Sequence, residues 1–114
     1  SGNLLNADYT DEVIATGRGS PSVIGFIGNG SSSEEVSALR AKVGDSQMIW
    51  TPGVNLAVGD GDMGQRYGHP KEAVLAGSDA IIVGSGIHGT NSRLAAAAEY
   101  ARESFEALCE REGQ

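Results

Sequence analysis

The chain is poor in positive charge. Eight lysines and arginines face fifteen aspartates and glutamates, so the formal net charge of the 114 residues is −7 at pH 7. This balance opposes a surface that tracks nucleic-acid phosphates, and we expect no nucleic-acid partner. One phosphorylated small molecule stays compatible with it, because a single local site can be positive on an acidic protein.

Cysteine and long apolar runs are scarce as well. The single cysteine, Cys109, excludes an internal disulfide, and its helical surroundings predict a small packing residue. No apolar run approaches the roughly 20 residues of a membrane-spanning helix, so we expect no membrane partner. The cytoplasm is the default compartment for such a chain.

Glycine, in contrast, is abundant, and many of the 17 glycines stand where apolar runs end. Three runs predict buried strands, and four helical patterns alternate with them, which favours a parallel α/β sheet with right-handed crossovers. Three strands alone leave two bare edges, so we expect a segment of a larger sheet or barrel. The expected strands are 22–28, 47–51 and 80–84; the expected helices are 4–16, a stretch between Ser32 and Gly44, 70–76, and a last helix from a cap at Thr90 or Asn91 to about Arg111.

Packing expectations follow from the same patterns. Trp50 alternates with Ile49 in the second strand, which predicts a core or barrel-wall position. Ser32 followed by Glu35 is a capping box and predicts the start of a helix. The last helix is expected to pack through one apolar face formed by Leu94, Ala98, Ala101, Phe105 and Leu108.

Ligands of parallel α/β proteins bind beyond the carboxyl ends of the strands. The turn around Ser85 follows the third strand between Gly84 and Gly86, and its backbone N–H groups can face an anion. Gln65, Arg66 and Tyr67, in the loop 53–69, can complete a phosphate site. Residue types alone leave a second interpretation open, in which the glycines only end a strand and the loop residues are a solvated surface.

Other polar residues give weaker signals. Asp60 and Asp62 resemble the start of a calcium loop without its later ligands, so no metal site is expected. His69 is expected in a loop or at a helix start, whereas His88 faces the loop mouth and can touch a ligand. Ser31–Ser33 is expected to be a loop and helix cap, because no base accompanies the hydroxyls.

Three motifs together carry a family resemblance: Thr51-Pro-Gly-Val-Asn-Leu56, Gly64-Gln-Arg-Tyr67 and Gly77-Ser-Asp-Ala-Ile-Ile-Val-Gly84. With their order and spacing, the chain resembles the carboxyl-terminal half of orotidine 5′-monophosphate decarboxylase. The resemblance implies a partial TIM (βα)₈ barrel over residues 1–114 as a single segment, with about three parallel strands and four helices. It further implies a homo-oligomer that takes part, without a cofactor, in converting orotidine monophosphate (OMP) to uridine monophosphate (UMP) and CO₂.

The resemblance also implies binding roles. Pro52 would lie against the pyrimidine, Gln65 and Tyr67 would hold the phosphate, and Gly84 would donate a backbone N–H to the same phosphate. At Ser85 the family has an arginine that pairs with the phosphate, and Arg66 is the candidate to compensate for its loss.

The catalytic residues of the family are missing from this sequence. Its Asp-x-Lys-x-x-Asp array belongs to the amino-terminal half, and the two lysines here, Lys42 and Lys71, sit in no such pattern. We therefore expect no catalytic residue in this chain and a requirement for an amino-terminal half of the same barrel. Two alternatives remain: a non-catalytic α/β module that binds a partner or phosphorylated metabolite, or one that self-assembles. A dinucleotide-binding unit at Gly84–Gly89 is disfavoured, because no strand can follow it.

Overall fold

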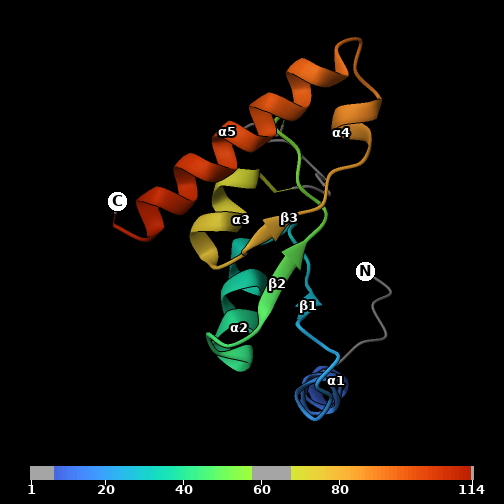
Figure 1. The fold of residues 1–114 in the computed structure, drawn as a ribbon, viewed down its shortest axis with the longest axis vertical. Helices are drawn as coiled ribbons and strands as arrows, with labels where there is room; N and C mark the ends of the chain where they lie inside the picture. The colour runs from blue at the N-terminus through green and yellow to red at the C-terminus, as the bar shows by residue number, and fades with distance from the viewer. Residues whose placement is uncertain (1–6, 58–67, 114) are drawn as a thin grey trace.

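The computed structural model describes residues 7–57 and 68–113 (Figure 1). Helices and strands alternate along these residues, as the sequence predicts. One short helix, α4, was not expected, because the sequence indicated only a turn there. The elements are α1 (Ala7–Arg18), β1 (Gly25–Ile27), α2 (Ser33–Val43), β2 (Met48–Thr51), α3 (Pro70–Ala76), β3 (Ala80–Ile81), α4 (Ser85–His88) and α5 (Arg93–Arg111).

The three strands form one parallel sheet in the order β1-β2-β3, which confirms the predicted α/β class. The register places Ile27 beside Trp50 and Trp50 beside Ala80. Backbone pairing continues past the assigned ends, since Gly28 N–H donates to the Trp50 carbonyl at 2.9 Å. Ile82 N–H donates to the Thr51 carbonyl of β2, also at 2.9 Å.

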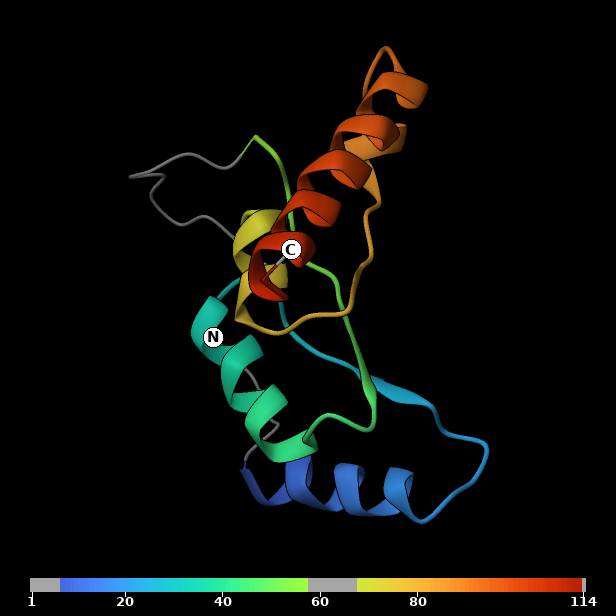
Figure 2. The ribbon, with the colours of Figure 1, turned by 60° about the vertical axis from the view of Figure 1, so that its left-hand side comes forward.

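Helices cover one face of this sheet. Ile49 points to that side and is fully buried, and it forms the core with Ile14 of α1 and Val43 of α2. Phe26 and Leu39 pack against this cluster. Figure 2 shows α1 crossing α2 at the end of the molecule away from α4 and α5. The core therefore lies between the sheet and the helices that precede and follow β1.

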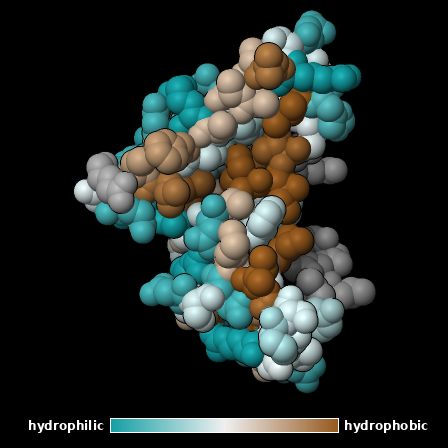
Figure 3. All heavy atoms as spheres, viewed as in Figure 1, coloured by the Kyte–Doolittle hydropathy of each residue, from teal (hydrophilic) through white to brown (hydrophobic). Residues whose placement is uncertain are grey.

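The opposite face of the sheet has no covering layer among the described residues. Ile27 is 70% exposed, Ile82 is 40% exposed and Trp50 is 39% exposed. Figure 3 shows apolar side chains gathered in a band down the middle of the face seen in Figure 1. A hollow of about 250 Å³ opens beside Trp50, lined by Val23, Ile24, Gly25, Phe26 and Ile27. We call the surface of Ile27, Trp50 and Ile82 the bare face.

The expected core position of Trp50 is therefore wrong, and its alternative, a barrel wall, fits. Strand pleating sends Ile49 and Thr51 toward the helices and Trp50 to the other side. A strand that is apolar on both faces needs a layer on each. The described residues supply only the helical layer.

The apolar face predicted for α5 is also wrong. Leu94 is 86% exposed and Phe105 is 66% exposed, whereas Tyr100 and Ala107 are buried. Helix α5 packs against α3 and α4 (Figure 1). Its packed side is the one with small residues and the tyrosine, because these helices approach closely. The predicted stripe of larger side chains, with Leu94 and Phe105, faces away from the other described residues.

The start of α5 differs from the prediction too. Ser92 is the N-cap, rather than Thr90 or Asn91. The Thr90 hydroxyl instead donates to the Ile87 carbonyl at 2.8 Å, where it closes the end of α4. The Thr90 hydroxyl is thus engaged at the end of the unforeseen helix α4, and the cap of the next helix lies two residues further along the chain.

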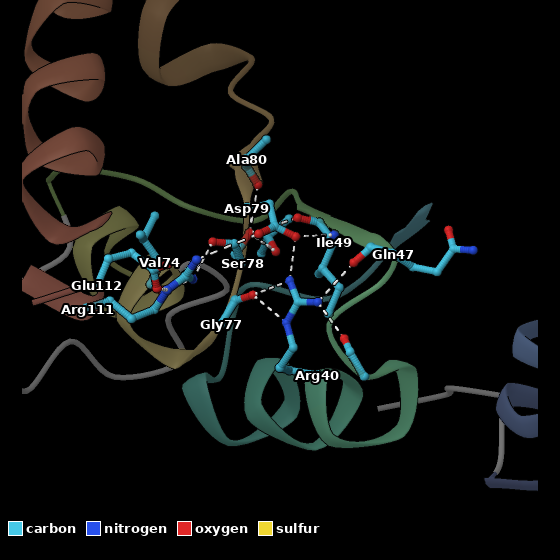
Figure 4. Close-up of polar contacts among 12 residues, drawn as sticks. Arg40, Gln47, Ile49, Val74, Gly77, Ser78, Asp79, Ala80, Arg111 and Glu112 are labelled. Atoms are coloured by element: carbon cyan, nitrogen blue, oxygen red, sulfur yellow. Dashed lines mark hydrogen bonds and ion pairs between the residues drawn. The ribbon is translucent and has the colours of Figure 1, made fainter. Parts of the chain in front are cut away.

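Arg40 of α2 ties together the amino ends of β2 and β3 (Figure 4). Its guanidinium donates to the carbonyls of Gly44, Gln47 and Gly77 at 2.8 to 3.0 Å. It also forms an ion pair with Asp79. The planar fork of arginine allows one side chain to reach carbonyls of the α2–β2 and α3–β3 connections at once.

The same carboxylate carries two further contacts. Asp79 accepts a hydrogen bond from Ile49 N–H at 2.9 Å and lies 3.6 Å from the Arg111 guanidinium. Arg111 donates in turn to the carbonyls of Val74 and Ser78 at 2.7 and 2.9 Å. This Arg40–Asp79–Arg111 network joins α2, α3, α5 and the sheet at the edge where the strands begin.

We expect Arg40→Ala to lower the free energy of unfolding by about 2–4 kcal/mol, because it leaves part-buried carbonyls without their donor and removes the closer of the two cations beside Asp79. Urea denaturation followed by circular dichroism measures this loss. Arg102→Ala is the matched control: Arg102 pairs only with glutamates on the exposed surface of α5. Its midpoint should stay near that of the unaltered chain. Equal midpoints for both variants would contradict a structural role of the network.

Candidate functional site

The loops after β1 and β2 meet at the carboxyl edge of the sheet. Gly30 N–H donates to the Pro52 carbonyl at 2.9 Å, so the two loops are joined directly. A Cβ on Gly30 would collide with this carbonyl and with the Thr51 methyl group, so only glycine permits the approach. Pro52 lies half-buried at this edge, where the sequence predicted a ligand contact.

Ser85 begins the single helical turn of α4, and Gly84 is its N-cap. The turn is closed by bonds from His88 N–H to Gly84 O at 3.1 Å and from Gly89 N–H to Ser85 O at 2.9 Å. Gly84 and Ser85 are both exposed beyond the carboxyl end of β3. The expected glycine-flanked turn is thus a short helix at the predicted edge of the sheet.

The loop after β2 leaves and re-enters the fold at one place. Val54 and Gly68 form a parallel bridge, with Asn55 N–H donating to Gly68 O and Gly68 N–H to Gly53 O, both at 2.9 Å. The chain on either side of residues 58–67 is therefore held at the carboxyl end of β2. The candidates Gln65, Arg66 and Tyr67, together with Asp60 and Asp62, lie outside the described residues.

The remaining polar candidates have identifiable places. His69 caps α3, and its Nδ1 accepts from Lys71 N–H at 3.1 Å, which confirms the predicted helix start. Ser32 caps α2 by accepting from Glu35 N–H at 3.4 Å, as the capping box predicts. A Cβ on Gly84 would lie 3.7 Å from His88 Nε2, so the His88 imidazole lies beside the Gly84 backbone.

Tyr100 is a residue of this edge that sequence reasoning missed. Its hydroxyl accepts a hydrogen bond from Leu56 N–H at 3.0 Å, although Tyr100 stands on α5. The sequence carried no signal for this contact, since Tyr100 fell outside the apolar face predicted for the helix. The contact ties α5 to the loop that follows Pro52.

The described parts of the chain contain neither a cluster of metal-ligating side chains nor a membrane-spanning helix. Across residues 7–57 and 68–113, no three side chains of His, Cys, Asp or Glu gather closely enough to hold a metal ion. None of the helices described there has the length and apolarity to cross a bilayer. Cys109 is a half-buried free thiol on α5, as a small packing residue would be.

Comparison with known proteins identifies the family to which this chain belongs. A sequence model described as "Orotidine 5′-phosphate decarboxylase / HUMPS family" matches residues 2–100. The chain belongs to this family. Over 94% of its length it is 36% identical to the orotidine 5′-phosphate decarboxylase of Aureobasidium pullulans, and over 97% of its length it is 34% identical to the uridine 5′-monophosphate synthase of Bos taurus.

Solved structures agree on the fold. The orotidine 5′-phosphate decarboxylase of Pyrococcus horikoshii OT3 matches 83% of the chain at a TM-score of 0.64 and 27% identity. The decarboxylase of Sulfolobus solfataricus matches 93% at a TM-score of 0.69 and 24% identity, which shows the fold alone. These matches cover 41% and 44% of the two solved chains. The three parallel strands and their helices are therefore part of a TIM barrel, as predicted.

The chain spans only part of the length of its relatives. It covers 38% of the Aureobasidium pullulans protein and 22% of the Bos taurus protein. The matches thus establish family membership and fold.

Proposed function

We propose that this chain is the carboxyl-terminal segment of an orotidine 5′-phosphate decarboxylase barrel. Completed by an amino-terminal half, it takes part in converting OMP to UMP and CO₂ in pyrimidine biosynthesis. The amino-terminal half comes either from a preceding segment or from another chain. The relatives, an orotidine 5′-phosphate decarboxylase and a uridine 5′-monophosphate synthase, support this reaction, and the partial coverage supports the division into halves.

The bare face is the observation that carries the proposal. A parallel sheet whose inner side chains are Ile27, Trp50 and Ile82 exposes apolar surface that water disfavours. Both outer strands also present unpaired backbone edges among the described residues. An amino-terminal half that closes the barrel covers this face and pairs both edges at once.

In this proposal the chain binds the nucleotide, and the missing half supplies the chemistry. Pro52 lies against the pyrimidine, and Gly84 donates its backbone N–H to the phosphate together with Gln65 and Tyr67. The amino-terminal half brings the aspartates and lysines that protonate the carbon losing CO₂ and stabilise the developing charge. Alone, the chain is inactive.

Ser85 sets how tightly the phosphate is held. A serine hydroxyl offers one neutral donor where a guanidinium offers a charged, two-pronged contact. The net charge of −7 makes a local cation more valuable, because the rest of the chain repels a phosphate. Arg66 is the candidate that the resemblance leaves to supply that charge. We further propose a cytoplasmic location and a homo-oligomeric assembly of completed barrels.

Assembly can be tested with a separately produced amino-terminal half, such as that of the Aureobasidium pullulans relative. Trp50 is the one tryptophan of the chain and belongs to the bare face. Mixing should shift its fluorescence to shorter wavelength and should start the loss of OMP absorbance. Trp50→Phe provides the matched control, because it removes the emission that belongs to this face.

Two outcomes would contradict the proposal. One is the absence of both signals after mixing, with and without Ser85→Arg. The other is a stable monomer of the isolated chain in sedimentation, since a bare apolar face and open edges favour association.

Binding of the UMP phosphate tests the role of Ser85. In the assembled complex, Ser85→Arg should tighten UMP binding roughly thirtyfold to a thousandfold, the range of about 2–4 kcal/mol that a charge-assisted paired contact adds. Isothermal titration calorimetry measures the change. Ser46→Arg adds the same charge before β2, at the opposite edge of the sheet, and should leave the affinity nearly unchanged. Equal gains from both variants would show a general charge effect and no phosphate site at Ser85.

A further inference from the structure

Tyr100 is a deeply buried tyrosine with its polar end directed at the candidate site. Only 4% of its surface is exposed. Its hydroxyl accepts from the backbone N–H of Leu56 at 3.0 Å, across a sequence separation of 44 residues. A buried phenol needs a partner for its hydroxyl, and here the partner is the loop after β2.

The same side chain touches α4. A Cβ built on Gly86 would collide with the Tyr100 hydroxyl and would lie 3.0 Å from its Cζ atom. The Gly86 backbone therefore lies directly against the Tyr100 ring, and no larger residue fits there without movement. Figure 1 shows α4 lying beside the first turns of α5.

These two contacts join segments that carry the candidate ligand groups. Leu56 follows Pro52 by four residues, and Gly86 follows Ser85 directly. We propose that Tyr100 is a positioning residue, which sets the distance between the Pro52 loop and the Gly84–Ser85 turn. The inference rests on the proposed function, because it assigns Tyr100 to the nucleotide site of that function.

The hydroxyl carries this role separately from the ring. The ring fills the space against Gly86 and contributes to burial, whereas the hydroxyl alone holds the part-buried Leu56 amide. Removing only the oxygen leaves the packing in place and releases the loop from α5. The part-buried Leu56 N–H then lacks its acceptor, and the loop shifts so that water can accept this hydrogen bond.

The test is Tyr100→Phe in the assembled complex, with UMP as the probe. We expect UMP binding to weaken about threefold to tenfold, the effect of one neutral hydrogen bond. The melting temperature should change little, and the amide of Leu56 should exchange its hydrogen faster. Tyr9→Phe on α1 is the matched control, since α1 lies at the opposite end of the molecule from α4 (Figure 1). It should leave UMP affinity unchanged.

A second variant tests the contact with α4. Gly86→Ala should push the Tyr100 hydroxyl away and weaken UMP binding at least as much as Tyr100→Phe. The two changes together should cost less than their sum, because Phe removes the atom that the new methyl group meets first. Full additivity would overturn the contact as the cause.

The outcomes separate the two hypotheses. If the unaltered complex does not bind UMP, the proposed function fails, and the role of Tyr100 in a nucleotide site fails with it. If the unaltered complex binds UMP and Tyr100→Phe binds it equally well, the positioning role is overturned and the proposed function stands. A lower melting temperature with unchanged UMP affinity likewise overturns it, since a merely structural hydroxyl behaves in that way.

Discussion

The structure depends on a constraint of parallel sheets, which need a layer on both faces. In residues 7–57 and 68–113, helices supply one layer, and Ile49 of β2 packs under it against Ile14 and Val43. The other face shows Ile27, Trp50 and Ile82 to solvent. This asymmetry leaves an apolar face without a layer among the described residues, and it is the face that the proposed amino-terminal half would cover.

The two ends of the parallel strands have different roles. Where the strands begin, the Arg40–Asp79–Arg111 network joins three helices to β2 and β3 through backbone carbonyls (Figure 4). Where the strands end, glycines allow close backbone approaches, and Gly30 and Gly86 are among the positions where a side chain would collide with its surroundings. Charged contacts thus stabilise the end where the strands begin, and the other end carries the loops that can face a ligand. This division is common in barrels, whose ligands bind at the carboxyl ends of the strands.

Much of the fold could be predicted because its signals are local. Helix α3 begins at Pro70 and ends at Ala76, as the proline and the following glycine indicated, and Ser32 caps α2 as its spacing to Glu35 indicated. The errors concern relations between elements. The face of α5 was wrong because Leu94 and Phe105 continue a helical stripe that meets no partner in the described residues. The cap of α5 was wrong because the Thr90 hydroxyl bonds to the Ile87 carbonyl of α4, a one-turn helix where the sequence indicated only a turn.

By itself, the sequence determined the alternation of helices and strands, the family and the positions of Pro52, Gly84 and Ser85 after their strands. Periodicity, caps and motifs are properties of neighbouring residues, so one chain contains them in full. Only the tertiary structure decided which side of each element is buried, and that Tyr100 reaches Leu56 across 44 positions. Such contacts depend on how strands pair and helices cross, and no pattern within a single segment records them.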